Sequence, residues 1–233
     1  MDIEQFLVSI SNSTKEDDID LYKAINDSIT ILNNAIEKYD INTIALSFNG
    51  GKDACIILQL YRLLLYRLNK SFNNTRILYF ITPNDFKEID EFMISIKDLY
   101  NIDYIRYDCS MKDGMIKEVE LGYQCVVIGT RIGDPYTNES TPSFQPSSTD
   151  NGWPKFMRIN PIIKWTYKQV WYFLREMKLP YCKLYDAGYT SLGNITNTMK
   201  NEALKQIDDD GNITYAPAYM LQDDTLERNT RKT

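Results

Sequence analysis

Residues 44–61 read IALSFNGGKDACIILQLY and place Gly-Gly-Lys-Asp between two apolar stretches. The first stretch is short and bounded by polar residues, which predicts a buried strand over 43–48. The second has apolar residues at helical spacing, which predicts a helix over 54–68. Glycines at such a junction let main-chain N–H groups approach a phosphate at the start of a helix. By itself the turn fits a plain strand-to-helix connection equally well.

The neighbouring sequence repeats this alternation of elements. Helices are predicted over 16–39, 85–100 and 110–121, the second starting at Pro83-Asn84-Asp85, and strands over 76–81, 103–107 and 125–129. The alternation predicts an α/β fold: a doubly wound, mostly parallel sheet with helices on both faces. Ligands of such sheets lie beyond the carboxyl ends of the strands, where the strand order reverses. The glycine turn and residues 129–134 are both expected at that edge.

The second half of the chain has a different character. Residues 135–154 form a long loop rich in proline, with the aromatic residues Tyr136, Phe144 and Trp153, which favours a functional loop over disorder. A helix is predicted over 166–177 with Thr166 as its cap, and a turn over 208–212. We expect a single domain with a helical cover (1–40), a nucleotide-binding α/β core (41–134) and a C-terminal extension (135–233).

The amino-acid composition excludes several classes of catalytic and metal site. Hydrophobic residues make up 43% and charged residues 25% of the 233 positions, as in ordinary globular proteins. The chain has no histidine, which excludes histidine bases, histidine zinc sites and nucleotidylyltransferases with histidine signatures. Its cysteines are scattered (Cys55, Cys109, Cys125 and Cys182), which favours reduced core thiols over a metal site.

Charge and hydropathy suggest where the protein works. The net charge of −6 argues against a nucleic-acid partner, because phosphate contacts need a basic face. No apolar run approaches the ~18 residues that span a bilayer, and the acidic N-terminus does not resemble a signal peptide. We therefore expect a cytoplasmic protein without a membrane partner.

The pattern Ser-x-x-Gly-Gly-Lys-Asp of residues 47–53 resembles the pyrophosphate loop of the ATP pyrophosphatase superfamily. It matches neither the Walker P-loop nor the glycine motif of dinucleotide-binding folds. Three further segments narrow the resemblance, because 129–174 (beginning GTRIGDP), 181–194 (ending TSLGN) and 217–231 (ending LERNTR) resemble the eukaryotic-type FAD synthases. The resemblance implies that FMN and ATP react to FAD and pyrophosphate with Mg²⁺. One departure is Gly133, where threonine is familiar in the family.

The resemblance also implies site residues. ATP binding is assigned to Ser47, Phe48, Asn49, Gly50, Gly51, Lys52, Asp53, Ile81, Thr82, Thr130 and Arg131. Flavin binding is assigned to Asp134, Asp150, Asn151, Trp153, Arg158, Arg228 and Arg231. Catalytic roles are expected for Asp53, Asp134, Arg228 and Arg231. Asp53 is also the candidate for the magnesium side, with most of the metal contacts made by substrate phosphates.

The implied chemistry suits a chain without histidine. A phosphate monoester has a second pKa of about 6, so the FMN phosphate is already an anion at neutral pH and needs no general base. Catalysis would then depend on positioning and on cations that neutralise the phosphates. Simpler interpretations stay open: the tail arginines as a solvated surface, Trp153 as a loop anchor, and Asp134 and Asp150 as turn residues.

Other functions also stay open at this point. The expected partners are the small molecules ATP and FMN, with onward transfer of FAD to apoflavoproteins as a further possibility. An adenylylsulfate reductase would need a redox cysteine in its tail, and the last cysteine is Cys182. Many tRNA thiolation enzymes need cysteine pairs or a basic RNA-binding surface. A non-catalytic nucleotide- or flavin-binding protein would keep the glycine loop but not a second-substrate site.

Overall fold

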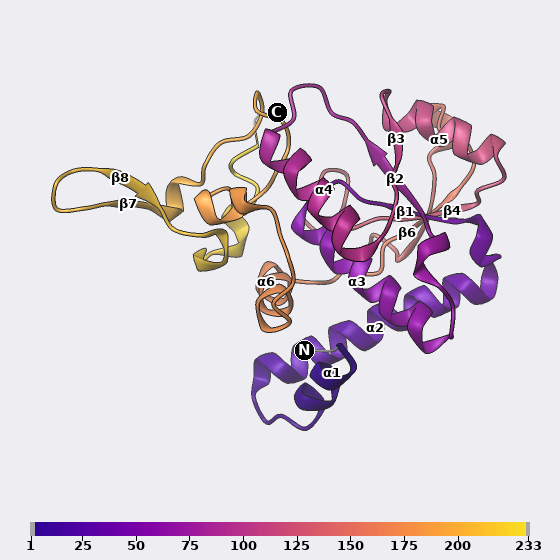
Figure 1. Cartoon of the computed structure of the whole chain (residues 1–233), viewed down its shortest axis with the longest axis horizontal. Helices are drawn as coiled ribbons and strands as arrows, with labels where there is room; N and C mark the ends of the chain where they lie inside the picture. Colours follow the sequence, from indigo (N-terminus) through magenta and orange to yellow (C-terminus); the bar gives the residue numbers. More distant parts are fainter. Residues whose placement is uncertain (1–2, 232–233) are drawn as a thin grey trace.

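The computed structural model describes residues 3–231, and a sheet of six strands forms its centre (Figure 1). The strand order is β3-β2-β1-β4-β6-β5. Their bounds are β1 (Ile44–Ser47), β2 (Arg76–Phe80), β3 (Ile105–Tyr107), β4 (Cys125–Val127), β5 (Phe144–Pro146) and β6 (Met157–Ile159). β5 pairs antiparallel with β6, whereas the pairings from β3 to β6 are parallel. The predicted α/β fold with a mostly parallel sheet is confirmed.

Helices cover both faces of this sheet, as predicted. Their bounds are α1 (Ile3–Ser11), α2 (Glu16–Lys38), α3 (Lys52–Arg67), α4 (Lys87–Tyr100), α5 (Met111–Glu120) and α6 (Tyr167–Glu176). Side chains alternate between the faces of a strand. Ala45 therefore joins the small core under α5, whereas Leu46 joins the large core shared with α3 and α4.

The strand order reverses beside β1. From β1 the chain proceeds outward to β2 and β3, and it then returns to the other side of β1 to form β4. Leu46 pairs in register with Ile77 on one side and with Val127 on the other. The carboxyl ends of β1 and β4 consequently flank the reversal, which is where doubly wound sheets bind ligands. The glycine loop that joins β1 to α3 lies at this point.

The N-terminal helices pack beneath the core. α2 contacts α3, α6 and β6, and α1 contacts α2. Trp165 anchors this layer, because its indole N–H donates to Ser28 Oγ at 2.9 Å. Helix α1 lies within the expected helical cover 1–40, although its own bounds were not predicted; it buries Phe6, Leu7 and Ile10.

Several boundaries differ from the sequence prediction by one or two residues, and one cap is confirmed. Helix α4 begins at Lys87 rather than at Pro83–Asp85, because Asn84 has a left-handed φ of 60° and Phe86 at the N-cap is extended, with φ −69° and ψ 136°. The predicted strand over 125–129 ends at Val127. Thr166 caps α6 in a reciprocal capping box with Gln169, as the sequence indicated.

The second half contains strands that were not predicted. The proline-rich loop contributes β5, which lies at the edge of the sheet beside the newly found β6. The predicted turn over 208–212 joins β7 (Lys205–Ile207) to β8 (Ile213–Tyr215). This hairpin extends away from the sheet (Figure 1).

Candidate active site

A cavity of about 580 Å³ lies at the carboxyl ends of β1 and β4. Four stretches far apart in the sequence line it, and the lining residues fall within 47–54, 128–135, 185–192 and 228–231. Its size suits a small-molecule ligand. A larger hollow of about 800 Å³ lies over α6 and residues 219–225, but none of the glycine-loop residues reaches it. The smaller cavity is therefore the candidate active site.

The glycine loop forms one wall of this cavity. Gly50 has a φ of 74°, which glycine adopts more easily than other residues. The N–H of Gly51 donates to Asn49 Oδ1 at 3.0 Å, and the N–H of Lys52 donates to Tyr185 Oη at 3.0 Å. These bonds hold the loop against the cavity at the start of α3, where the dipole of the helix favours a bound anion.

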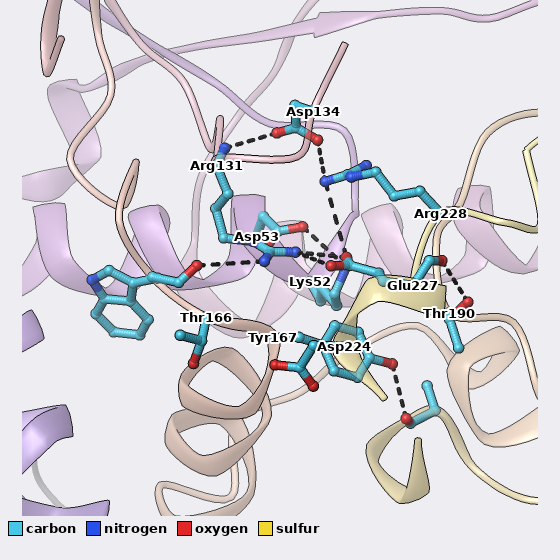
Figure 2. A network of polar contacts seen from close by, with 12 residues as sticks. Lys52, Asp53, Arg131, Asp134, Thr166, Tyr167, Thr190, Asp224, Glu227 and Arg228 are labelled. Carbon is cyan, nitrogen blue, oxygen red and sulfur yellow. Dashed lines mark hydrogen bonds and ion pairs between the residues drawn. The ribbon is translucent and has the colours of Figure 1, made fainter. Parts of the chain in front are cut away.

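Four charged side chains form a buried network behind the loop (Figure 2). Lys52 Nζ lies 2.5 Å from Glu227 Oε1 and 3.1 Å from Asp53 Oδ2. The guanidinium of Arg131 donates from Nε to Asp53 Oδ1 at 2.6 Å and from Nη2 to both Glu227 oxygens at 2.6 and 2.7 Å. Lys52 is only 2% exposed, Arg131 3% and Glu227 5%, so these three are shielded from water, whereas the side chain of Asp53 is 18% exposed and faces the cavity.

The network fixes the charge of its carboxylates. Burial alone would raise the pKa of Asp53, but the charges of Arg131 and Lys52 outweigh it and hold that pKa well below its usual value. Burial likewise opposes the charge of Glu227, while Lys52 and Arg131 lower its pKa. Both groups are therefore ionised at neutral pH, and two cations face two anions.

Asp134 and Arg228 form a second pair at the cavity wall. The Asp134 carboxylate accepts a hydrogen bond from the main-chain N–H of Arg131 at 2.7 Å and forms an ion pair with Arg228. Burial raises the pKa of Asp134, and the charge of Arg228 limits the increase. The pairing holds Arg228 at the wall of the cavity that the glycine loop also lines.

Arg231 is the cation without a carboxylate partner at this cavity. No described acidic side chain lies within ion-pair distance of its guanidinium, which rests on Gly193. Burial, and then the neighbouring charge of Arg228, lower the pKa of Arg231. An arginine stays charged even so. Its positive charge is consequently available to an anion in the cavity.

Known proteins are similar to this chain over most of its length. The family model described as the phosphoadenosine phosphosulfate reductase domain matches residues 110–200. The chain is 37% identical over 218 residues to "Probable FAD synthase" of Caenorhabditis elegans, covering 93% of this chain and 42% of that protein. It is 36% identical over 245 residues to "Probable FAD synthase" of Schizosaccharomyces pombe, covering 99% of this chain and 89% of that protein. The chain belongs to the FAD synthase family.

A solved structure of the FAD synthase family shares this architecture. The crystal structure of Candida glabrata FMN adenylyltransferase, in complex with FMN and the ATP analogue AMPCPP, superposes with a TM-score of 0.86. Its sequence is 25% identical, and the match covers 97% of this chain and 96% of that one. The chain thus spans nearly the whole of this enzyme but less than half of the Caenorhabditis elegans FAD synthase.

Several residues that the FAD synthase resemblance assigned to ATP lie at the cavity: Ser47, Asn49, Gly51, Lys52, Asp53 and Thr130. Gly50 and Arg131 do not line it, and Arg131 turns its guanidinium to Asp53 and Glu227. Phe48 is fully buried and stacks on Tyr104 at 5.8 Å, which leaves only its main chain for a ligand. Ile81 and Thr82 follow β2, outside the cavity lining.

The flavin assignments divide into two groups. Asp134, Arg228 and Arg231 line the cavity, whereas Asp150, Asn151, Trp153 and Arg158 do not. Residues 149–151 form a 3-10 turn held to α5, where Lys112 Nζ donates to the Asn151 carbonyl at 3.0 Å. Trp153 packs on Phe156 at 6.2 Å, as expected of a loop anchor. Arg158 on β6 has a buried Nε without a hydrogen-bond partner.

Several residues of the site were not predicted from the sequence. Glu227 precedes Arg228 directly, but a single carboxylate beside two arginines carries no recognisable pattern. Tyr185, Ser191 and Leu192 line the cavity and lie within the segment 181–194, whose resemblance was noticed without assigning any residue in it. Gly193 was part of the TSLGN motif, and its packing beneath Arg231 depends on a contact that is remote in sequence.

Proposed function

We propose that this chain transfers the adenylyl group of ATP to FMN, giving FAD and pyrophosphate. One observation supports this most directly. A single cavity brings the glycine loop, the strand-end segment 129–135 and the tail arginines together, although the loop and the arginines are far apart in the sequence. The glycine loop and the arginines suit phosphate groups, and membership of the FAD synthase family supports ATP and FMN as the substrates.

The residues of the cavity suit a reaction between two anions. An oxygen of the FMN phosphate forms a bond to the α-phosphorus of ATP, and the bond from that phosphorus to the bridging oxygen breaks. Pyrophosphate leaves with the electron pair. The N–H groups that follow Lys52 in the first turn of α3, together with Arg228 and Arg231, bind and orient the two phosphate chains, and the charges of the arginines lower the repulsion between the chains. The FMN phosphate needs no general base because it is already ionised.

The fit of Mg²⁺ can be judged from the acidic residues. Within residues 3–231, no group of three or more potential ligands is placed to hold a metal ion. Asp53 lines the cavity, but its oxygens already accept from Arg131 at 2.6 Å and from Lys52 at 3.1 Å. Asp53 could therefore give Mg²⁺ at most one protein contact, and substrate phosphates would supply the others, as is common for this ion. Bound Mg²⁺ would neutralise phosphate charge.

The role of Asp53 can be tested separately. In Asp53→Asn we expect a higher Mg²⁺ concentration for half-maximal rate, because the carboxylate contact is lost while the shape is kept. An unchanged rate and Mg²⁺ dependence would contradict the role.

The flavin site and the cellular context are proposals of a finer kind. We place the flavin beside Asp134 and along residues 150–158, with the unpartnered Nε of Arg158 as a donor to it.

No described helix has the length and apolarity of a transmembrane helix. The cytoplasmic location and the transfer of FAD to apoflavoproteins stay predictions.

The decisive experiment follows the label of the α-phosphate. The protein is incubated with ATP labelled at the α-phosphate, Mg²⁺ and FMN, and the products are separated by chromatography. We expect labelled FAD and one pyrophosphate per FAD, and neither product without FMN. Binding of both nucleotides without turnover would instead support the non-catalytic alternative.

A second assay addresses the reductase alternative. A reductase of this superfamily would need an accessible thiol in its tail, but Cys55, Cys125 and Cys182 are buried, and the partly exposed Cys109 lies between β3 and α5. Burial raises the pKa of Cys125 to about 12 and that of Cys182 to about 11, which makes both poor nucleophiles at neutral pH. Sulfite release from an adenylylsulfate in the presence of a thiol reductant would overturn the proposal.

A further inference from the structure

We propose that Glu227 is a positioning residue that fastens the arginine segment, residues 226–231, to the glycine loop. In this way it sets where Arg228 and Arg231 meet the phosphates of the substrates. The inference rests on the proposed function, because it assumes that these arginines act on phosphates.

The side chain of Glu227 joins three distant parts of the chain. It accepts from Lys52, the first residue of α3, and from Arg131, which follows β4. Both oxygens of the carboxylate accept from one nitrogen of Arg131, Nη2, and the 2.5 Å contact with Lys52 holds Oε1 beside the glycine loop. A residue held on both sides of the strand reversal cannot shift without breaking one of these contacts.

Two buried polar side chains hold the main chain of the same segment. Thr190 Oγ1 donates to the Glu227 carbonyl at 2.7 Å (Figure 2). Asn201 Nδ2 donates to the Leu226 carbonyl at 2.9 Å and to Thr190 Oγ1 at 3.0 Å. These bonds settle the path of residues 226–227, so that the side chain of Glu227 points to Lys52 and not to solvent.

Apolar packing contributes little to the position of the segment. Its sequence is LERNTR, and Leu226, its apolar residue, is only partly buried against the main core. Polar contacts therefore carry most of the attachment. Thr190 and Asn201 hold the main chain at 226–227, and the N–H of Met199 donates to the Thr230 carbonyl at 3.0 Å. The side chain of Glu227 adds the ion pairs that join this segment to Lys52 and Arg131, and without them the arginines would lose their fixed distance from the glycine loop.

The electrostatic effect of Glu227→Gln on ATP binding is opposite to the effect of lost positioning. With Glu227 present, Lys52 and Arg131 are balanced by Asp53 and Glu227. Glu227→Gln would leave two buried cations with one carboxylate, and the extra positive charge would by itself favour ATP. A loss of activity in this variant must therefore come from lost positioning, since the electrostatic effect has the opposite direction.

The test compares Glu227→Gln with Glu202→Gln, a matched change at an exposed residue that pairs with Lys205. Hydrogen exchange is measured by mass spectrometry for peptides covering 226–231 and for peptides covering β1 and β4. Steady-state kcat and KM are measured for ATP and FMN. In Glu227→Gln we expect exchange at least tenfold faster in 226–231, with a larger increase there than in β1 and β4, and kcat at least tenfold lower. Glu202→Gln should match the wild type in both.

Two more variants keep the test decisive. Glu227→Asp retains the charge on a shorter side chain and should recover part of the lost kcat. Thr190→Val removes the hydroxyl that holds the Glu227 carbonyl, and we expect it to speed hydrogen exchange in 226–231. It replaces Glu227→Gln in the test if that variant does not fold. Wild-type exchange together with kcat within twofold of the wild type in Glu227→Gln would overturn the inference. Failure of the wild type to make FAD would reject the proposed function, while the exchange measurements would still decide the attachment.

Discussion

Arg231 reaches the cavity across a residue that has no side chain. A methyl group at Gly193 would lie 2.5 Å from Nη2 of Arg231, which is closer than two such atoms can approach. Asn197 Oδ1 would also lie 2.5 Å from this methyl group. Both contacts are made by the ends of side chains, so they would move aside and the fold would stay intact. The absence of a side chain at residue 193 therefore leaves room for the guanidinium of Arg231 at the cavity.

We expect Gly193→Ala to lower kcat/KM at least tenfold while changing the melting temperature by no more than a few degrees. The loss arises because Arg231 is displaced from the phosphates. A double-mutant cycle with Arg231→Gln checks this cause, since the effect of Gly193→Ala should nearly vanish when Arg231 is absent. Equal losses in both backgrounds would assign the effect to something other than Arg231.

At the scale of elements, the beginning of α3 depends on a distant tyrosine. Gly51 at the N-cap position has no side chain with which to cap the helix, and Tyr185 Oη accepts from the N–H of Lys52 instead. Tyr185 is also buried, with its ring packed edge-on against Trp171 at 5.3 Å. The hydroxyl thus joins the helix that begins at the glycine loop to the segment 181–194.

We expect Tyr185→Phe to destabilise the protein by about 1–2 kcal/mol, because the N–H of Lys52 loses its partner while the ring contacts remain. The KM for ATP should rise several-fold. Tyr181→Phe is the matched control, since its ring also packs on Trp171 but its hydroxyl bonds an exposed partner, Asp186. Urea denaturation and initial rates measure both effects; equal behaviour of the two variants would argue against the capping role.

The elements also show how far local sequence determines this fold. Periodicity identified α2 to α5 and β1 to β4, because each buries an apolar face of its own. Strands β5 and β6 lie in or beside the proline-rich segment, and β5 ends at Pro146, so the local sequence there indicates a loop. They exist because β6 extends the sheet next to β4, which is a tertiary effect.

The same distinction applies to the candidate site. The glycine loop could be predicted because its function needs consecutive residues with a particular backbone. Glu227 and Gly193 could not be predicted, because their importance arises from partners that are remote in sequence. The assignments of Asp150 and Trp153 came from resemblance, and their place outside the cavity lining leaves them as predictions.

At the scale of the whole molecule, the buried ion network makes stability depend on pH. The folded-state pKa of Glu227 lies below its usual 4.5, so its contribution is complete above that pH and is lost as the pH falls through the folded value. We expect Glu227→Gln to lower the unfolding free energy by about 3 kcal/mol at pH 7. The difference from the wild type should shrink below about pH 4.5, since the wild-type carboxylate then becomes protonated and uncharged like glutamine.

Urea titrations of both proteins at pH 7 and pH 3.5 measure this convergence. A difference that stays the same at both pH values would show that Glu227 stabilises the protein through its shape and not its charge.

The ion pair between Lys52 and Glu227 also has a consequence for the order of folding. It connects residues 175 positions apart, whereas β1 and β2 are separated by a single helix. Closing a longer loop costs more entropy, so contacts between distant residues generally form later. A refolding chain should therefore pass through a stage in which the sheet is assembled but the enzyme is still inert. After dilution from urea, far-ultraviolet ellipticity should recover before FAD synthesis does.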